Sequence, residues 1–200
     1  MHVSSKNILT IDPPFLFKTG EIFNDPLFIA YETYGELNDK KDNAILVTTG
    51  LSPSAHLCST SEDQSPGWWE KIAGEGKYID TQKYFVICIN SLGSCYGSSG
   101  PASFKPDTDV KYGLSFPEVT IEDMAQSMKP VIDKLGIKTL HSIIGPSMGG
   151  MTAMSLVKQF PSITKNLILI STAASCRPFS IAVRSLQRKL ITSDQNWEEG

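Results

Sequence analysis

LHSIIGPSMGG, residues 140–150, is the stretch of sequence that decides the fold. It begins with an apolar run typical of a buried strand, and a helical pattern follows at residues 151–160. Between them Gly145, Ser147 and Gly149 match G-x-S-x-G in its required context of strand, sharp turn and helix. On such a turn the serine hydroxyl projects clear of the sheet, and side chains at the two glycine positions would collide with the packed strand and helix. A chance match to the bare pattern is the alternative, but the context favours Ser147 as a nucleophile.

Two further apolar runs and one amphipathic pattern surround this stretch. Residues 44–48 and 84–89 lack polar alternation, which predicts strands that are buried on both faces. A helix is predicted from Thr120, an N-cap residue with Asp123 in the position of a capping-box acid, to Gly136, a natural stop. One face of this helix carries its apolar residues, which are Ile121, Met124, Ala125, Met128, Ile132 and Leu135.

The remaining elements complete an alternating order. Pro130 lies inside the helix predicted between Thr120 and Gly136, and it should kink that helix or remove one of its hydrogen bonds. Short strands are predicted at 15–18 and 27–33, another strand at 166–170 and a helix at 179–191. Buried strands that alternate with helices predict an α/β fold with a largely parallel sheet covered on both sides.

Composition and charge exclude several classes of function. The formal net charge is -3 without a block of Lys or Arg, so nothing favours a nucleic acid or an acidic membrane surface as partner. No apolar run could span a bilayer, and residues 1–14 lack a signal-peptide pattern. The four cysteines, at 58, 88, 95 and 176, show no CxxC spacing, which suits a reducing cytoplasm. No His/Cys/Asp cluster has metal-ligand spacing, so no metal is predicted.

Two loops are candidates for lining a site. If Ser147 attacks a carbonyl, the Met148 N–H at the helix start is one oxyanion donor, and the Leu51 N–H in the loop after strand 44–48 is the predicted second. An ordinary loop that satisfies its own backbone is the alternative for residues 49–56. The glycine-rich residues 93–100 lack the phosphate-binding patterns and are expected to form a mobile loop that could line a pocket.

Together these motifs resemble the homoserine O-acetyltransferase family of serine and homoserine O-acyltransferases. The resemblance covers nearly the whole chain in order. Its carriers are residues 50–56, Gly67-Trp68-Trp69-Glu70, Ile79-Asp80-Thr81, residues 84–90, 93–101, 116–123, 145–150 and 185–188.

The resemblance implies an α/β-hydrolase fold and a ping-pong reaction. An acyl group passes from an acyl-CoA co-substrate to the serine, then to the hydroxyl of L-homoserine or L-serine, in methionine or cysteine biosynthesis. The implied partners are these small molecules, with no bound cofactor, and relatives of this family are commonly dimers. Because an amino-acid hydroxyl must be favoured over water as acceptor, the site should be narrow and closed.

Two departures from the family pattern bear on the subtype, and one residue matches the pattern. The oxyanion loop reads Gly50-Leu51-Ser52-Pro53, where many relatives have His-Ala-Leu-Thr/Ser-Gly, and this form resembles the branch that acts on L-serine, often with succinyl-CoA. Arg184 stands where acetyl-using relatives commonly have an uncharged residue, and its guanidinium could pair with a succinyl carboxylate. Arg188 matches the family's substrate-binding arginine. Solvated surface arginines are the alternative for both.

A serine nucleophile needs a base, and none follows Ser147. The histidines are His2, His56 and His141, of which the last two are expected to be structural. The α/β-hydrolase order is Ser, Asp, His, but only Asp194, Glu198 and Glu199 are acids after Ser147. Residues 1–200 are therefore expected to be the N-terminal portion of one α/β-hydrolase domain without its cap and C-terminal strands, inactive alone. An esterase and a non-catalytic remnant are the alternatives.

Overall fold

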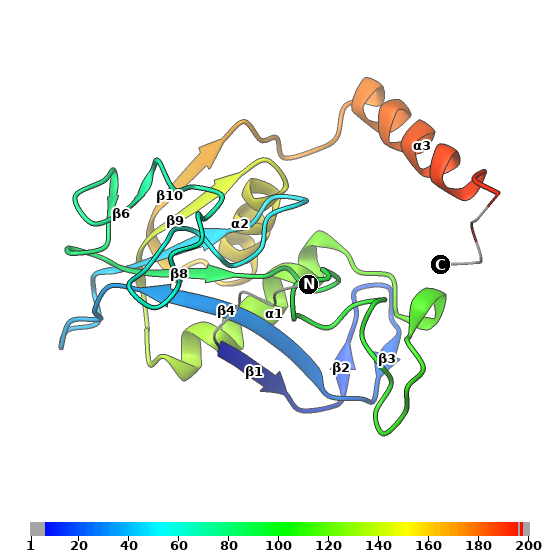
Figure 1. Ribbon diagram of the computed structural model, residues 1–200, viewed down its shortest axis with the longest axis horizontal. Coiled ribbons are helices and arrows are strands. Elements are labelled where there is room, and N and C mark those ends of the chain that lie inside the picture. Colours follow the sequence, from blue (N-terminus) through cyan, green and yellow to red (C-terminus); the bar gives the residue numbers. More distant parts are fainter. Residues whose placement is uncertain (1–6, 196, 198–200) are drawn as a thin grey trace.

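The computed structural model describes residues 7–195 and residue 197, so His2, Glu198 and Glu199 lie outside the described part. Figure 1 shows the elements in their spatial arrangement. In chain order they are β1 (Asn7–Ile11), β2 (Phe15–Leu16), β3 (Ile22–Phe23), β4 (Leu27–Tyr34), β5 (Ala44–Thr48), β6 (Ala73–Gly74), β7 (Ile79–Asp80), β8 (Phe85–Ile89), the 3-10 turn η1 (Gly113–Ser115), α1 (Ile121–Lys134), β9 (Leu140–Pro146), α2 (Met148–Gln159), β10 (Thr164–Ile170) and α3 (Pro178–Thr192).

The central sheet has the strand order β1-β4-β8-β5-β9-β10. β4 runs antiparallel to both β1 and β8, while β8, β5, β9 and β10 run parallel to one another. The prediction of an α/β fold with a largely parallel sheet is confirmed. The carboxyl ends of β5, β8 and β9 meet at one edge of the sheet, which is where open α/β sheets place their sites.

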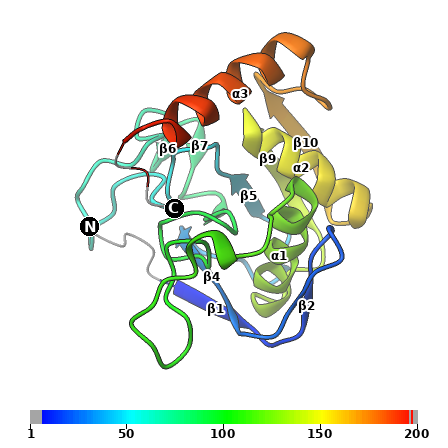
Figure 2. The ribbon, with the colours of Figure 1, turned by 90° about the vertical axis from the view of Figure 1, so that its right-hand side faces the viewer.

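The two faces of the sheet are covered differently. α1 and α2 lie on one face, where Met128 and Leu156 join a core with Leu46, Ile87 and Ile143 (Figure 2). The opposite face is covered by the segment between β5 and β8, whose side chains Leu57, Cys58, Trp68 and Trp69 form a second core with strand residues. Both faces are covered, as predicted, but among the described residues helices supply only one of the two layers.

Helix α1 begins and ends where the sequence predicts. Thr120 and Asp123 form a capping box, in which each side chain bonds the other residue's backbone N–H. Gly136 follows the helix with φ of 70°, a conformation that other residues adopt at a cost. The helix continues through Pro130, which has no N–H to donate within it.

Other elements depart from the predicted bounds. β1 was not predicted, and the predicted strand 15–18 shortens to β2, which pairs with β3 across Gly20. α2 begins at Met148, earlier than the predicted 151, because the helix starts directly from the Ser147 turn. Residues 93–100 are not the expected mobile loop: Ser98 and Ser99 are buried, and their hydroxyls accept hydrogen bonds from the Ala30 and Phe28 amides of β4.

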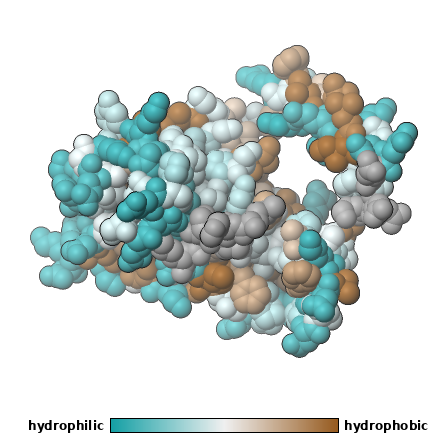
Figure 3. Space-filling view, in the orientation of Figure 1, coloured by the Kyte–Doolittle hydropathy of each residue, from teal (hydrophilic) through white to brown (hydrophobic). Residues whose placement is uncertain are grey.

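The last two elements are exposed. β10 is an edge strand whose Leu167–Ile170 side chains are all at least 36% exposed, and no residue of α3 is buried. Figure 3 shows apolar side chains gathered on α3, which stands away from the rest of the molecule. Within residues 7–195 and 197, no helix is both long and apolar enough to cross a membrane.

Candidate active site

Ser147 occupies a strained turn between β9 and α2. Its φ of 53° and ψ of −123° lie where a non-glycine residue is held only by its surroundings. The backbone on both sides is fixed, since Ser147 N donates to Ile170 O at 2.9 Å and Gly150 N donates to Ser147 O at 3.0 Å. The residue is exposed, and its hydroxyl does not cap the helix. The turn therefore presents the hydroxyl to solvent.

The glycines that flank Ser147 allow three backbones to meet. A Cβ on Gly145 would lie 2.6 Å from the Gly150 Cα, and a Cβ on Gly149 would lie 2.4 Å from the Thr48 carbonyl oxygen. A Cβ on Gly150 would lie 2.5 Å from the Thr172 side chain. The first two close approaches explain the G-x-S-x-G spacing in physical terms, and the third explains the additional glycine.

The loop after β5 lies beside this turn. Thr48 Oγ1 donates to Gly149 O at 2.8 Å and lies 3.3 Å from Ile144 O, which ties the end of β5 to both sides of the turn. A Cβ on Gly50 would lie 3.9 Å from the Pro146 carbonyl oxygen. The structure thus brings the predicted loop Gly50-Leu51-Ser52-Pro53 next to Ser147.

The two predicted oxyanion donors start from backbone positions that suit the role. Met148 is the first residue of α2, so its N–H has no acceptor within the helix. In the described chain no residue accepts a hydrogen bond from Leu51 N–H, and the Leu51 side chain is 65% exposed. Both amides are available for a ligand oxygen at the carboxyl edge of the sheet.

The two described histidines have partners of their own. His141 Nδ1 is 2.8 Å from Ser142 Oγ, and its ring contacts the ring of Tyr84. His56 is buried and bonded to Glu32 and Ser65. This agrees with the structural roles predicted for both. No hydrogen bond joins either one to Ser147 in the described part of the chain.

The two predicted specificity arginines lie on α3, apart from Ser147. Arg184 Nη1 donates to Gln187 Oε1 at 2.8 Å, and Arg188 Nη2 donates to Ser185 Oγ at 3.2 Å, so both bond within their own helix. Both are exposed, and Figure 1 shows α3 separated from the sheet. The structure does not bring these arginines to the turn.

Comparison with known proteins places this arrangement in a family. A model of the alpha/beta hydrolase fold matches residues 43–200. The chain belongs to the α/β-hydrolase family. Its Ser147 turn, with a helix directly behind it, lies at the carboxyl edge of the family's central sheet.

Curated relatives show which members of the α/β-hydrolase family this chain resembles. The chain is 50% identical over 187 residues to the serine O-succinyltransferase of Xanthomonas axonopodis pv. citri (strain 306), covering 94% of this chain and 46% of the relative. It is 53% identical over 172 residues to the L-serine/homoserine O-acetyltransferase of Streptomyces lavendulae, covering 86% and 46%. These matches confirm the resemblance to serine and homoserine O-acyltransferases. The chain spans about half the length of the curated relatives it matches.

Solved structures give the same fold with two chemistries. The homoserine O-acetyltransferase from Bacillus anthracis superposes with a TM-score of 0.87 at 32% identity, covering 97% of this chain and 54% of that one. Esterase E22 superposes with a TM-score of 0.86 at 34% identity, with the same coverage. The shared fold therefore does not by itself distinguish acyl transfer from ester hydrolysis.

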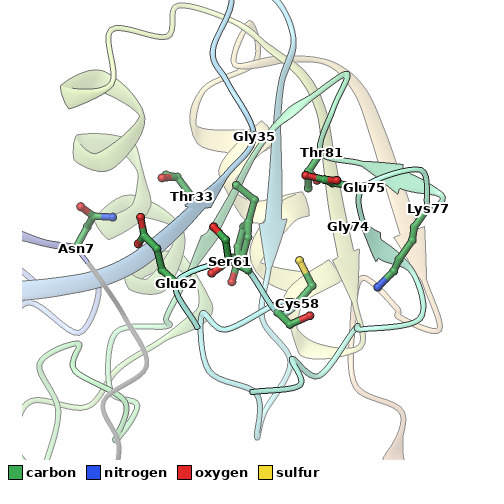
Figure 4. Close-up of a pocket in the computed structure, with 13 residues that line it drawn as sticks. Asn7, Thr33, Gly35, Cys58, Ser61, Glu62, Gly74, Glu75, Lys77 and Thr81 are labelled. Atoms are coloured by element: carbon green, nitrogen blue, oxygen red, sulfur yellow. The ribbon is translucent and has the colours of Figure 1, made fainter. Parts of the chain in front are cut away.

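A cavity of this α/β-hydrolase lies away from the Ser147 turn. It has a volume of about 800 Å³ and is lined by residues that include Thr33, Cys58, Glu62 and Lys77 (Figure 4). β4 ends beside this cavity, and because β4 is antiparallel to β8, that end lies at the opposite edge of the sheet from Ser147. The geometry of the Ser147 turn therefore identifies the candidate active site.

The buried cysteines do not compete with Ser147 as nucleophiles. Burial raises the pKa of Cys58 to about 11, and burial also raises the pKa of Cys88 well above its ordinary value. A thiol with a raised pKa stays protonated and unreactive at neutral pH. Cys88 is completely buried, as the sequence predicts. No group of three His, Cys, Asp or Glu residues in the described chain could hold a metal ion.

Sequence reasoning missed the residues that hold the loop beside Ser147. Thr48 ends the predicted strand 44–48 and Thr49 begins the predicted loop 49–56, and their position at this junction was an available signal. Glu32 lies within β4 and is only 1% exposed. The only signal for its role in the sequence was that it is a single acidic residue within a largely apolar strand.

Proposed function

We propose that the protein containing this chain transfers an acyl group from acyl-CoA to the hydroxyl of L-serine or L-homoserine. The observation that carries the proposal is the strained Ser147 turn, placed beside the Gly50–Pro53 loop in a chain whose relatives are serine and homoserine O-acyltransferases. In the first step Ser147 Oγ attacks the thioester carbonyl, the C–S bond breaks and CoA leaves as a thiol. In the second step the acceptor hydroxyl attacks the acyl-serine, and Ser147 is regenerated.

The oxyanion that forms in each step is assigned to the Leu51 and Met148 amides. Two backbone donors aimed at the developing charge stabilise the transition state more than the ground state, and loss of one donor typically costs about 10²–10³-fold in rate. The base that takes the Ser147 proton, together with its acid, is assigned to a further part of the same α/β-hydrolase domain. This agrees with relatives that are about twice as long as the chain.

Substrate choice forms the finer part of the proposal. Arg188 is assigned to the carboxylate of the amino-acid acceptor and Arg184 to the carboxylate of a succinyl donor; both assignments require α3 to lie over Ser147 in the complete protein. The Gly50-Leu51-Ser52-Pro53 loop favours L-serine as acceptor. A cytoplasmic location and a homodimer, which the family resemblance implies, belong to the same proposal.

The test uses the protein translated from the complete reading frame that contains this chain. CoA release is measured with acetyl-CoA and succinyl-CoA, each against L-serine and L-homoserine. Ser147→Ala should lower the rate by roughly 10³-fold or more, since the nucleophile is lost. Ser115→Ala, which changes an exposed serine in η1, is the matched control and should leave the rate unchanged.

Ester hydrolysis is the second candidate, and the likeness to esterase E22 favours it. The same Ser147 turn would serve, with water as the acceptor. If the protein hydrolyses p-nitrophenyl acetate but releases no CoA with any of the four pairs, the acyltransferase proposal is wrong and the esterase is supported.

A further inference from the structure

A buried ionic cluster lies against the far end of the loop that carries Leu51. Glu32 on β4 is 1% exposed and His56 is 6% exposed. His56 Nδ1 lies 3.1 Å from Glu32 Oε2, and His56 Nε2 lies 2.8 Å from the Ser65 carbonyl oxygen. The Ser65 carbonyl oxygen can only accept, so Nε2 donates to it, and a proton on Nδ1 as well makes His56 an imidazolium paired with the Glu32 carboxylate.

This cluster holds the backbone of residues 54–57 through several hydrogen bonds. The Tyr34 hydroxyl donates to Glu32 Oε2 at 2.7 Å and accepts from Leu57 N at 2.7 Å. From the other side Trp68 N donates to His56 O, and Trp68 Nε1 donates to Ser54 O at 3.0 Å. The downstream end of the loop is therefore fixed to both β4 and the Trp68 segment.

The upstream end of the same loop is fixed independently. Thr48 Oγ1 bonds the Gly149 carbonyl, and Thr49 Oγ1 lies 3.1 Å from Ser91 Oγ. Between the two anchors, Leu51 and Ser52 are exposed and Pro53 is partly exposed. The position of the Leu51 N–H is thus set by anchors at each end of the loop and not by its own side chain.

We propose that Glu32 and His56 are positioning residues that hold the Leu51 N–H at the Ser147 turn through the backbone of residues 54–57. The proposal rests on the proposed role of Leu51 as an oxyanion donor. Neither side chain touches the reacting atoms: His56 acts through its own backbone in the loop, and Glu32 acts through His56 and Tyr34. A displacement of about 1 Å in such a donor can cost about 10²-fold in rate.

The protonation of His56 makes the hydrogen bonds that hold residues 54–57 depend on pH. Burial by itself lowers the His56 pKa, but the hydrogen bonds to Ser65 and Glu32 and the charges of Glu32 and Asp63 outweigh it, so the pKa lies above 6.5. The groups that face His56 are Glu32 on β4, Asp63 with Oδ2 at 3.9 Å and the Ser65 hydroxyl at 3.3 Å; Tyr34, Cys58 and Cys88 lie around Glu32.

The direction of this pH dependence follows from the raised pKa of His56. The stabilising pair is complete below the unfolded pKa of about 6.5 and is lost as the pH rises through the higher folded value. Above that value one ring nitrogen no longer donates, and either the bond to Ser65 or the bond to Glu32 is lost.

The experiment compares the same substitution at two histidines of the complete protein. His56→Gln should lower kcat by about 10- to 100-fold for CoA release and for p-nitrophenyl acetate hydrolysis, with KM within about 2-fold, because an oxyanion donor acts in the transition state. His141→Gln removes an imidazole outside the site and should leave both constants unchanged. An unchanged kcat in a folded His56→Gln variant would overturn the proposed positioning role of His56.

A second variant guards against simple unfolding. The double variant Glu32→Gln with His56→Gln leaves no buried unpaired charge, so it should fold even if the single variants do not. Its kcat should fall as far as that of His56→Gln. We expect the wild-type rate to decline as the pH rises through the His56 pKa, and the double variant should not show this decline. A double variant with wild-type kcat and the wild-type pH profile would show that the pair has no positioning role.

The two proposals fail in different ways. A protein that hydrolyses p-nitrophenyl acetate without acyl transfer contradicts only the acyltransferase proposal, and the His56→Gln comparison still runs on the ester. As a direct check, ¹⁵N NMR should show both His56 ring nitrogens protonated at pH 6. An unprotonated nitrogen at that pH would contradict the ionic cluster itself.

Discussion

Residues 7–163 and the last two elements, β10 and α3, differ in how far their side chains are buried. β5 and β8 are buried along their whole length between two apolar layers, whereas β10 forms an exposed edge and no residue of α3 is buried. Most of the Ser147 turn is built by the first region, while β10 pairs with β9 as far as Pro146 and its Ile170 carbonyl accepts a hydrogen bond from Ser147 N. The candidate specificity arginines lie in the second. The candidate nucleophile and the candidate arginines thus lie in regions of unequal burial.

The largest expected difference between the regions concerns truncation of matched leucines. Leu140 on β9 is completely buried, and Leu140→Ala should lower the free energy of unfolding by about 2–5 kcal/mol through lost burial and a residual cavity. Leu186 on α3 is 58% exposed, and Leu186→Ala should change it by less than about 0.5 kcal/mol.

Denaturant unfolding of the 200-residue chain, followed by circular dichroism, measures both values. Equal losses would mean that α3 packs against the body in solution, and the contrast between the two regions would then be wrong.

A smaller effect is expected where the two glycines of the site differ. A Cβ on Gly149 would meet the Thr48 and Thr49 carbonyl oxygens at 2.4 and 2.8 Å, so Gly149→Ala should cost about 1–3 kcal/mol as the backbones move apart. A Cβ on Gly50 meets nothing closer than 3.7 Å, and Gly50→Ala should be nearly neutral for stability.

Thermal unfolding of the two variants in parallel tests this contrast. A stable Gly149→Ala variant would show that the close contact between α2 and the end of β5 is not required, which would weaken the account of the G-x-S-x-G spacing.

The parts of the fold that the sequence predicts well are those with a local cause. The strand-turn-helix around Ser147 follows from its glycines, and α1 follows from Thr120, Asp123 and Gly136, each of which acts within a few residues. β5 coincides with the predicted residues 44–48 because an unbroken apolar run is buried on both faces.

The parts that could not be predicted depend on contacts between distant residues. The periodicity of a helix identifies its apolar side, but it does not say which face of the sheet that side will cover. Tertiary packing places α1 and α2 on the same face. The pairing of Glu32 with His56 joins residues on different elements, and nothing in either local sequence names the partner. The anchoring of residues 93–100 to β4 through Ser98 and Ser99 is a tertiary effect of the same kind.

Helix caps provide the smallest test of the contrast between the regions. α1 begins with a capping box, while α3 begins at Arg177 without any side-chain cap. Thr120→Ala should lower the free energy of unfolding by about 1 kcal/mol, because the Asp123 amide loses its acceptor in a helix that packs on the sheet. Arg177→Ser supplies the missing cap but should leave the global value unchanged, because no residue of α3 is buried. Its effect should appear only as slower amide hydrogen exchange in the first turn of α3. A gain in global stability from Arg177→Ser would place α3 within the folded body and would remove the physical distinction between the region that holds Ser147 and the region that holds its candidate arginines.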